Sequence, residues 1–228
     1  LAKTFLVKGG VVQIAAGTAV DVEKTDVVSG ASLKASYAQL GQNISILNDN
    51  AETKSAIRVS YSGGDLNFTK KVSGDGVLHL DLGNQSDPNL AGELTFAENT
   101  SDDENTILVR LSNATYKYDS TDGFSNYVVG GGGTIKFDSP TSDVIKLDTI
   151  GWQYLAENPE KSGVIDLSGH EFTLGSGPAI EAGKIHFESS DNELWIDKDD
   201  FLDVSGSTER GNILVLDSAN PKRILIKG

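Results

Sequence analysis

Hydrophobic and polar residues alternate in short segments along the chain, and a glycine precedes many of these segments. In the segment Gly64-Asp65-Leu66-Asn67-Phe68 the two large apolar residues are two positions apart, which is the period of a β-strand. Glycine permits the turn before the strand, so we expect Leu66 and Phe68 to point inward and Asp65 and Asn67 to face water. Similar phrases begin at Gly10, Gly76, Gly92, Gly133, Gly163, Gly183 and Gly211. The pattern therefore predicts an all-β protein.

The predicted strands recur about every 8–12 residues between stretches rich in Asn, Asp, Ser and Gly, which is the spacing of all-β folds. We expect one domain over residues 1–228. A parallel β-solenoid, here a right-handed β-helix, is favoured because two-residue hairpin turns such as Asn-Gly and Asp-Gly are rare between the strands. An antiparallel β-sandwich is the alternative, since the repeated phrase has no regular period. The first residue is Leu and the chain has no Met, which indicates a fragment or a processed part of a longer chain.

One segment departs from the strand pattern. Leu33, Tyr37 and Leu40 lie at the i, i+4 and i+7 spacing of a helix face. Ser32 is placed as an N-cap and Gly41 as a C-terminal stop. We therefore predict a short helix near residues 32–40, either as an end cap of the stacked strands or as an irregular crossover.

Composition and charge exclude several classes of function. The chain has 33 acidic and 19 basic residues, a formal net charge of −14, so it would repel a nucleic-acid backbone. No apolar run approaches the roughly 20 residues of a membrane-spanning helix, so we expect no transmembrane segment. Cysteine is absent, which excludes disulfides and thiolate metal sites. The lack of cysteine is compatible with a cytosolic protein and also with a bacterial extracellular protein.

The chain resembles secreted bacterial β-helical surface proteins over roughly residues 60–228. The resemblance is carried by the phrases Gly-Glu-Leu-Thr-Phe at 92–96, Gly-Thr-Ile-Lys-Phe at 133–137, Asp-Leu-Ser-Gly-His-Glu-Phe-Thr-Leu at 166–174 and Gly-Lys-Ile-His-Phe at 183–187. They are similar to the passenger region of autotransporter adhesins and of filamentous-haemagglutinin-like proteins. This resemblance implies a right-handed parallel β-helix displayed outside a bacterial cell. It transfers no functional residue, and the membrane barrel that ends a complete autotransporter is missing here.

Nucleophilic and phosphate chemistry have little support in the sequence. His79 and His186 occupy outward positions of their strand phrases, so we expect surface histidines, and the third histidine is His170. No Gly-x-Ser-x-Gly elbow accompanies them, although a spatial Ser/His/Asp triad stays open. The glycine run 130–133 lacks the Lys-Ser/Thr ending of a phosphate loop and precedes a strand, so we interpret it as a flexible or tightly turning linker.

Clustered carboxylates are the main candidate for metal chemistry. Asp197, Asp199, Asp200 and Asp203 lie within seven residues and could supply hard oxygen ligands to calcium, the only cofactor we consider. Asp119 and Asp122 form a smaller cluster. Neither cluster has the spacing of an EF-hand or of a calcium-binding β-roll, so solvated turns are the simpler interpretation.

Acids and aromatic residues together suggest a second kind of site. A polysaccharide-degrading β-helix would need paired acids for general acid/base work and aromatic rings that stack on sugars. The candidate components are Asp81, Asp166 and Asp197, with Trp152, Trp195, Tyr116 and Tyr118. Because isolated outward aspartates usually only bind water, and because both tryptophans fit core or ladder positions, we expect no catalysis.

The interpretation that this pattern favours is a non-enzymatic surface protein, either a structural spacer or an adhesin. The polar segments 98–105 and 116–133 interrupt the strand phrase, so we expect them to present ligand-binding side chains. The expected contact residues are Tyr116, Tyr118, Asp122, Phe124 and Tyr127. The partner would be a glycan or a protein on a host or neighbouring cell, and the location extracellular. The alternatives are a polysaccharide-degrading enzyme and a surface-layer subunit assembled by calcium.

Overall fold

The computed structural model of the chain describes most of residues 3–197. The described ranges are 3–48, 54–83, 91–101, 105–138, 144–155, 157–170, 172–175, 179–189 and, for the backbone alone, 192–197. Within these ranges the chain is almost entirely strands and turns, which confirms the prediction of an all-β protein. No helix in the described part of the chain is long and apolar enough to cross a membrane.

The strands form three sheets, which we name sheets A, B and C. Sheet A contains β1 (Thr4–Lys8), β3 (Lys24–Val28), β5 (Asn43–Ile46) and β8 (Lys71–Gly74) in that order. Sheet C runs in the order β16 (Val164–Asp166), β14 (Thr134–Lys136), β12 (Ala114–Lys117), β10 (Gly92–Phe96) and β7 (Leu66–Phe68). Single turns of 3₁₀ helix, η1 (Tyr37–Gln39), η2 (Ser120–Asp122) and η3 (Pro159–Lys161), lie between strands.

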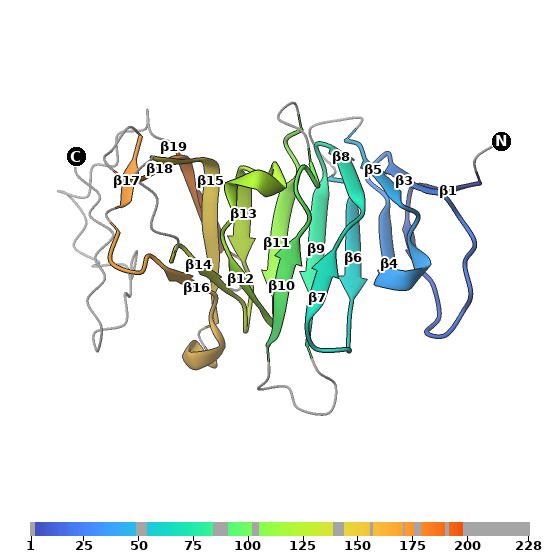
Figure 1. Ribbon diagram of the computed structural model, residues 1–228, viewed down its shortest axis with the longest axis horizontal. Coiled ribbons are helices and arrows are strands. Elements are labelled where there is room, and N and C mark those ends of the chain that lie inside the picture. The colour runs from blue at the N-terminus through green and yellow to red at the C-terminus, as the bar shows by residue number, and fades with distance from the viewer. Residues whose placement is uncertain are drawn as a thin grey trace.

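Sheet B is the largest and runs along the molecule (Figure 1). Its order is β17 (Phe172–Leu174), β18 (Ile180–Ser189), β15 (Ile145–Tyr154), β13 (Asn126–Val129), β11 (Leu108–Ser112), β9 (Val77–Asp81), β6 (Ala56–Ser60), β4 (Ser32–Ser36) and β2 (Val11–Gln13). A further strand, β19 (Asn192–Asp197), pairs with β18. Figure 1 shows β1 near the N-terminal end of the long axis and β17–β19 near the opposite end.

Among the described residues, every pair of neighbouring strands is parallel except the antiparallel pair β18 and β19. The alternative of an antiparallel sandwich is therefore wrong. Apart from β17, β18 and β19, which follow one another in sequence, neighbouring strands of one sheet are separated in sequence by a strand of another sheet, as β9 and β11 of sheet B are separated by β10 of sheet C. Such crossovers are what parallel pairing requires, and this arrangement is compatible with a β-solenoid.

Inward side chains align in rows across the parallel strands. In sheet B the row is Leu33, Ile57, Leu78, Val109, Tyr127, Ile150 and Ile185, and each of these residues is buried. In sheet C, Phe68 pairs with Phe96, and their rings lie 5.6 Å apart. Leu66 and Phe68 are buried whereas Asp65 and Asn67 are exposed, which confirms the alternation predicted there.

The predicted helix near residues 32–40 is wrong. Residues 32–36 form β4, in which Leu33 and Ala35 point inward and pair with Ile57 and Val59 of β6. Only residues 37–39 turn, as the 3₁₀ helix η1. The apolar spacing was misleading because Leu33 belongs to the strand while Leu40 follows the turn, so the two are buried by different elements.

The expectation for His186 is also wrong, because its side chain is only 2% exposed. It lies on the outward side of sheet B, as alternation predicts, but it is covered there. Gly151 is its partner on β15, and a Cβ atom added at Gly151 would lie 2.8 Å from the Cβ of His186. The histidine therefore occupies space that the glycine leaves open. His79 is half-buried on the same side of the sheet.

The two segments expected to be presentation loops are held against the strands instead. Thr100 and Ser101 are buried, and the carbonyl oxygen of Thr100 accepts a hydrogen bond from the backbone N–H of Val72 at 2.8 Å. The N–H of Ser101 donates to the carbonyl of Asp122 at 2.9 Å. Segment 98–101 thus lies between β8 and η2. Residues 102–104 are outside the described residues.

The glycine run 130–133 is a tight turn between β13 and β14. The N–H of Gly133 donates to the carbonyl of Gly130 at 3.0 Å, and the N–H of Gly130 donates to the carbonyl of Leu111 at 2.6 Å. Gly132 has a φ of +70°, a conformation that favours glycine. Of the two interpretations offered for this run, the tight turn is confirmed.

Candidate functional site

The five residues expected to contact a ligand form a buried cluster, which we call the inner cluster. It consists of Tyr116, Tyr118, Asp122, Phe124 and Tyr127, and each side chain is at most 7% exposed. Tyr116 lies in the inward row of sheet C between Leu94 and Ile135, and alternation therefore turns it away from solvent. The expectation that these side chains are presented to a ligand is wrong.

Asp122 is the centre of the inner cluster. Its Oδ2 accepts hydrogen bonds from the hydroxyls of Tyr116 and Tyr127, the latter at 2.6 Å. Its Oδ1 accepts the backbone N–H of Phe124 at 2.8 Å. Burial raises the pKa of Asp122, although these three hydrogen bonds act in the opposite direction. The cluster is therefore a satisfied polar network inside the fold.

The tyrosines of the inner cluster are held in the neutral form. Burial, together with the negative charges of Asp122 and Asp119, raises the pKa of Tyr118 to about 12. Burial also raises the pKa of Tyr116 and of Tyr127. The hydroxyls of Tyr116 and Tyr127 are buried and hydrogen-bonded to Asp122, which suits them to stabilising the fold and leaves them no access to a surface ligand.

The acids considered for polysaccharide cleavage are spread over different parts of the fold. Asp81 ends β9 in sheet B, whereas Asp166 ends β16 in sheet C, where its Oδ1 accepts the N–H of Ser168 at 2.9 Å. Asp197 ends β19, at the edge of sheet B. The fold therefore places the carboxylates of Asp81 and Asp166 on different sheets and does not pair them for general acid/base work.

The candidate calcium site lies largely outside the described residues. Asp199, Asp200 and Asp203 are not described, and Asp197 is described only in its backbone. In the rest of the described chain, no group of three or more potential metal-binding side chains occurs. Trp152 is half-buried and packs edge-on against Phe187 at 5.3 Å, as expected of a ladder residue, while the side chain of Trp195 is outside the described part.

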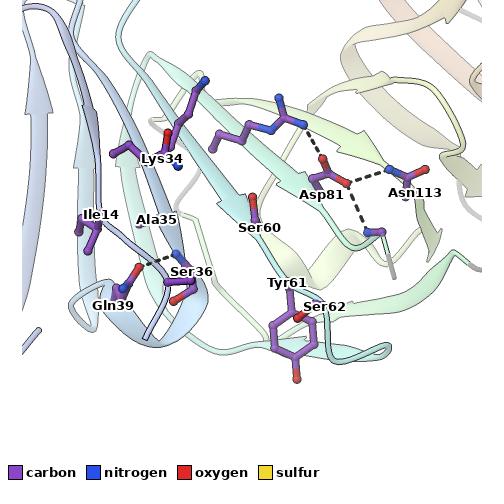
Figure 2. A pocket seen from close by; sticks show the side chains of 14 residues that line it. Ile14, Lys34, Ala35, Ser36, Gln39, Ser60, Tyr61, Ser62, Asp81 and Asn113 are labelled. Atoms are coloured by element: carbon purple, nitrogen blue, oxygen red, sulfur yellow. Dashed lines mark hydrogen bonds and ion pairs between the residues drawn. The ribbon is translucent and has the colours of Figure 1, made fainter. Parts of the chain in front are cut away.

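The described surface has a groove on the outward side of sheet B, which we call the outer groove. It has a volume of about 600 Å³ and crosses β2, β4, β6 and β9 near the N-terminal end of the sheet (Figure 2). Its polar lining includes Lys34, Ser36, Arg58, Ser60, Asp81 and Asn113. None of these residues was predicted as a contact, and only Asp81 was considered for chemistry.

Two outward rows of side chains run through the outer groove, and His79, which belongs to one of them, lies beside it. Lys34 of β4 pairs with Arg58 of β6, and Arg58 in turn pairs with His79 of β9. Two residues further along the same strands, Ser36, Ser60 and Asp81 are in register. Paired strands lie about 4.8 Å apart, and alternate residues share a face. One row therefore repeats basic side chains at this spacing, and the other repeats hydroxyl or acid groups.

Asp81 is fixed by three donors at one side of the groove. Its Oδ2 accepts a hydrogen bond from Arg58 Nη2 at 2.5 Å, and its Oδ1 accepts one from Asn113 Nδ2 at 2.8 Å. The backbone N–H of Gly83 also donates to Oδ1 at 3.3 Å (Figure 2). Burial opposes ionisation of Asp81, but the hydrogen bonds from Asn113 and Arg58 outweigh it and lower its pKa. Asp81 is therefore ionised at neutral pH.

The end of the groove near η1 is held by Gln39, whose side chain is 4% exposed. Its Nε2 donates to the carbonyls of Ala15 and Thr18 at 2.9 and 3.0 Å, and its Oε1 accepts the N–H of Ser36 at 2.9 Å. All three bonds join segments that line or border the groove. The groove is thus built into the backbone of neighbouring strands.

Tyr61 supplies an aromatic ring at the corner that follows β6, where Figure 2 shows it beside Ser62. The ring is half-buried, lies 6.5 Å from Tyr37 in an edge-on arrangement and packs over Gly63. A Cβ atom at Gly63 would come within 2.8 Å of this ring, so the glycine makes room for it. The corner therefore offers one aromatic side chain whose position is fixed by its neighbours.

A histidine and a serine lie beside the outer groove but form no catalytic triad. His79 Nε2 and Ser112 Oγ are 2.9 Å apart. Burial and the charges of Arg58 and Arg110 lower the pKa of His79 to about 4, so the imidazole is neutral at physiological pH. The nearby carboxylate of Asp81 is bound by Arg58 and Asn113. Among the described residues no acid is hydrogen-bonded to the imidazole of His79, so the third member of a triad is absent from that part of the chain.

A recurring sequence pattern corresponds to the outer groove. A triplet of a basic residue, an apolar residue and a serine or acid recurs as Lys34-Ala35-Ser36, Arg58-Val59-Ser60, His79-Leu80-Asp81, Arg110-Leu111-Ser112 and His186-Phe187-Glu188. Each triplet places two polar groups on the outward side of one strand. The register of the strands, which the sequence alone does not give, aligns the triplets into rows.

The outer groove combines hydroxyls, amides, the ion pair of Arg58 and Asp81, the ammonium of Lys34 and the ring of Tyr61. Such a lining can donate and accept many hydrogen bonds, but it holds a single carboxylate that is already ionised. Comparisons of this chain with protein-family models, with curated proteins and with solved structures found no match.

Proposed function

We propose that this chain is a non-enzymatic extracellular adhesin of β-solenoid architecture that binds a glycan in its outer groove. The observation that carries the proposal is the groove itself, a row of hydroxyl, amide and charged side chains fixed at the strand spacing on the outward side of sheet B. The solenoid is supported by the recurrent passage of the chain from sheet B to sheet C within parallel sheets. A surface location on a bacterium is supported by the resemblance of the strand phrases.

A glycan suits this groove because its hydroxyls can both donate and accept hydrogen bonds. Ser36 and Ser60 offer hydroxyls in register, and Asn113 offers an amide. Tyr61 adds an aromatic ring of the kind that packs against the apolar face of a sugar. The strand spacing of about 4.8 Å is close to the length of one sugar residue in an extended chain, so successive sugars could meet successive strands.

Binding without cleavage is supported by the state of the only carboxylate in the lining. Hydrolysis of a glycosidic bond requires an acid that carries a proton and a second carboxylate on the other side of the bond. Asp81 is ionised and paired with Arg58. The outer groove has no second carboxylate among its described lining residues.

The proposal is tested by measuring glycan binding and glycan cleavage on the same sample. We expect the purified chain to bind one or more oligosaccharides of a glycan array and to release no new reducing ends from them. Tyr61→Ala should weaken this binding about ten-fold, the cost of roughly 1.4 kcal/mol for losing a stacking ring. Tyr154→Ala, which changes a half-buried tyrosine at the end of β15, is the matched control.

Two results would contradict the proposal. Release of reducing or unsaturated ends would identify the chain as a polysaccharide-degrading enzyme. Equal binding by the wild type and Tyr61→Ala, with both samples showing the same far-ultraviolet dichroism, would place the binding site elsewhere on the molecule.

A further inference from the structure

The outward basic row of sheet B is more positive than the rest of this acidic chain would suggest. The chain has a net charge of −14, yet the described lining of the outer groove contains two cations, Lys34 and Arg58, and one carboxylate, Asp81. At physiological ionic strength charges are screened beyond about 8 Å, so a ligand in the groove responds mainly to these local groups. The groove therefore presents a positive site on an otherwise negative molecule.

Most members of the basic row are already neutralised by partners. Arg58 donates to Asp81, and its side chain is 44% exposed. Arg110 reaches from β11 to β18, where its two terminal nitrogens donate to both carboxylate oxygens of Glu188 at 2.7 and 2.6 Å. A bidentate pair of this kind satisfies the guanidinium and holds it in place. Neither arginine offers an unbalanced charge to a ligand.

Two glycines, Gly151 and Gly130, lie along the path of the Arg110 side chain towards β18. The strand partners of Arg110 are Val128 on β13 and, one strand further, Gly151 on β15. A Cβ atom at Gly130 would lie 3.6 Å from Arg110 Nε, so the side chain passes over the start of the glycine turn. The ion pair of Arg110 and Glu188 lies at the end of the basic row opposite Lys34.

Lys34 is the exception within the row. Its side chain is exposed in the middle of β4, and it forms no ion pair with any described residue. Figure 2 shows it on the wall of the outer groove, on the strand that also carries Ser36. An ammonium group in this position adds one unbalanced positive charge beside the neighbouring row of hydroxyls, which begins two residues further along β4 at Ser36.

We propose that the outer groove takes a uronic-acid-containing glycan and that the ammonium of Lys34 binds a sugar carboxylate. The serines of the parallel row then bind sugar hydroxyls, while Asp81 balances the charge of Arg58. This inference rests on the proposed glycan binding and adds the charge of the ligand to it. A neutral glycan would leave Lys34 without a partner, whereas a carboxylate balances it.

The test compares uronic-acid oligosaccharides with the same oligosaccharides after reduction of each carboxyl to a hydroxymethyl group. The probes are oligogalacturonate, oligomannuronate and hyaluronan fragments, measured by isothermal titration calorimetry at low and at physiological salt. We expect at least one acidic form to bind about five-fold more tightly than its reduced form, the value of one partly screened ion pair. Higher salt should narrow this difference.

Variants assign the effect to Lys34. Lys34→Gln should remove the preference for the acidic form, so that the acidic and the reduced oligosaccharides bind with equal affinity. Lys8→Gln removes the same charge from an exposed position of β1 that is outside the groove lining, and should change neither affinity. Because both lysines are exposed, we expect each variant to fold with unchanged dichroism and melting temperature.

The outcomes separate this inference from the proposed function. Equal binding of acidic and reduced forms overturns the carboxylate proposal while glycan binding stands. Failure of all acidic and reduced glycans to bind overturns both. Binding of polyglutamate as tight as that of the acidic glycans would identify an acidic protein as the partner and would also overturn the carboxylate proposal.

Discussion

The inner cluster and the outer groove are built from the same kinds of side chain, yet they have opposite properties. In the inner cluster Asp122 is 1% exposed, accepts two tyrosine hydroxyls and has a raised pKa. In the outer groove Asp81 is partly exposed and accepts hydrogen bonds from the guanidinium of Arg58 and the amide of Asn113. Its pKa is lowered. Asp122 lies inside the fold at the end of η2, whereas Asp81 lies on the outward side of β9. The comparison shows that this placement decides whether an aspartate completes a buried network or balances a cation at the surface.

The largest effect is expected from removing the carboxylate of the inner cluster. Asp122→Ala leaves the hydroxyls of Tyr116 and Tyr127 and the N–H of Phe124 without their acceptor in a buried space. Each buried group without a partner costs about 1–3 kcal/mol, so we expect the free energy of unfolding to fall by roughly 3 kcal/mol or more. Denaturant titration followed by dichroism measures this loss.

A neighbouring aspartate provides the control for that variant. Asp119 precedes η2 and accepts the backbone N–H of Thr121 at 2.9 Å in an exposed position. Asp119→Ala therefore removes a cap, at a cost of about 1 kcal/mol. Equal losses for the two variants would mean that the inner cluster contributes no more than an ordinary cap, and the contrast with the outer groove would fail.

A smaller effect is expected from the pH dependence of the same carboxylate. The pKa of Asp122 is raised in the folded state above the ordinary value of 3.8. The stabilisation linked to its proton is therefore complete below pH 3.8 and is lost as the pH rises through the raised pKa. Each unit by which the pKa is raised corresponds to about 1.4 kcal/mol.

Asp122→Asn isolates this contribution because the amide cannot ionise. The variant should gain stability relative to the wild type as the pH rises from 4 towards 8, since only the wild type has to bury a charge. Unfolding free energies of both proteins at several pH values give this difference, in which the titration of the other groups cancels. A difference that is constant across the range would show that the carboxylate is not perturbed.

Part of this fold could be predicted from the sequence because burial in a strand follows a local period. The alternation in Leu66-Asn67-Phe68 was sufficient to place both apolar side chains inside. The same rule applied to Ala114-Thr115-Tyr116-Lys117-Tyr118 places both tyrosines inside, but the polar residues around them favoured a surface loop instead. Aromatic residues at alternating positions were the better signal there.

Contacts between distant segments could not be predicted in this way. The outer groove depends on the register that aligns Lys34 with Arg58 and Arg58 with His79, over separations of more than twenty residues. Asp122 lies in a polar stretch, and nothing in its neighbours indicates that its carboxylate turns inward. The segment around Leu33 and Leu40 gave a false helical spacing because a strand and a turn bury them separately.

The smallest effect on stability is expected from the aspartate of the outer groove. Asp81→Asn breaks the ion pair with Arg58, whose side chain is 44% exposed, and such pairs contribute about 1 kcal/mol or less. The same change leaves Arg58 unbalanced beside Lys34, so binding of a uronic-acid oligosaccharide should become tighter, by about five-fold, while that of its reduced form stays the same. A catalytic or ligand-accepting role for Asp81 predicts the reverse, because loss of the carboxylate would then weaken binding or abolish turnover. Denaturant titration and calorimetry on this one variant thus test whether the outward aspartate only balances charge, in contrast to the inward one, which the fold requires.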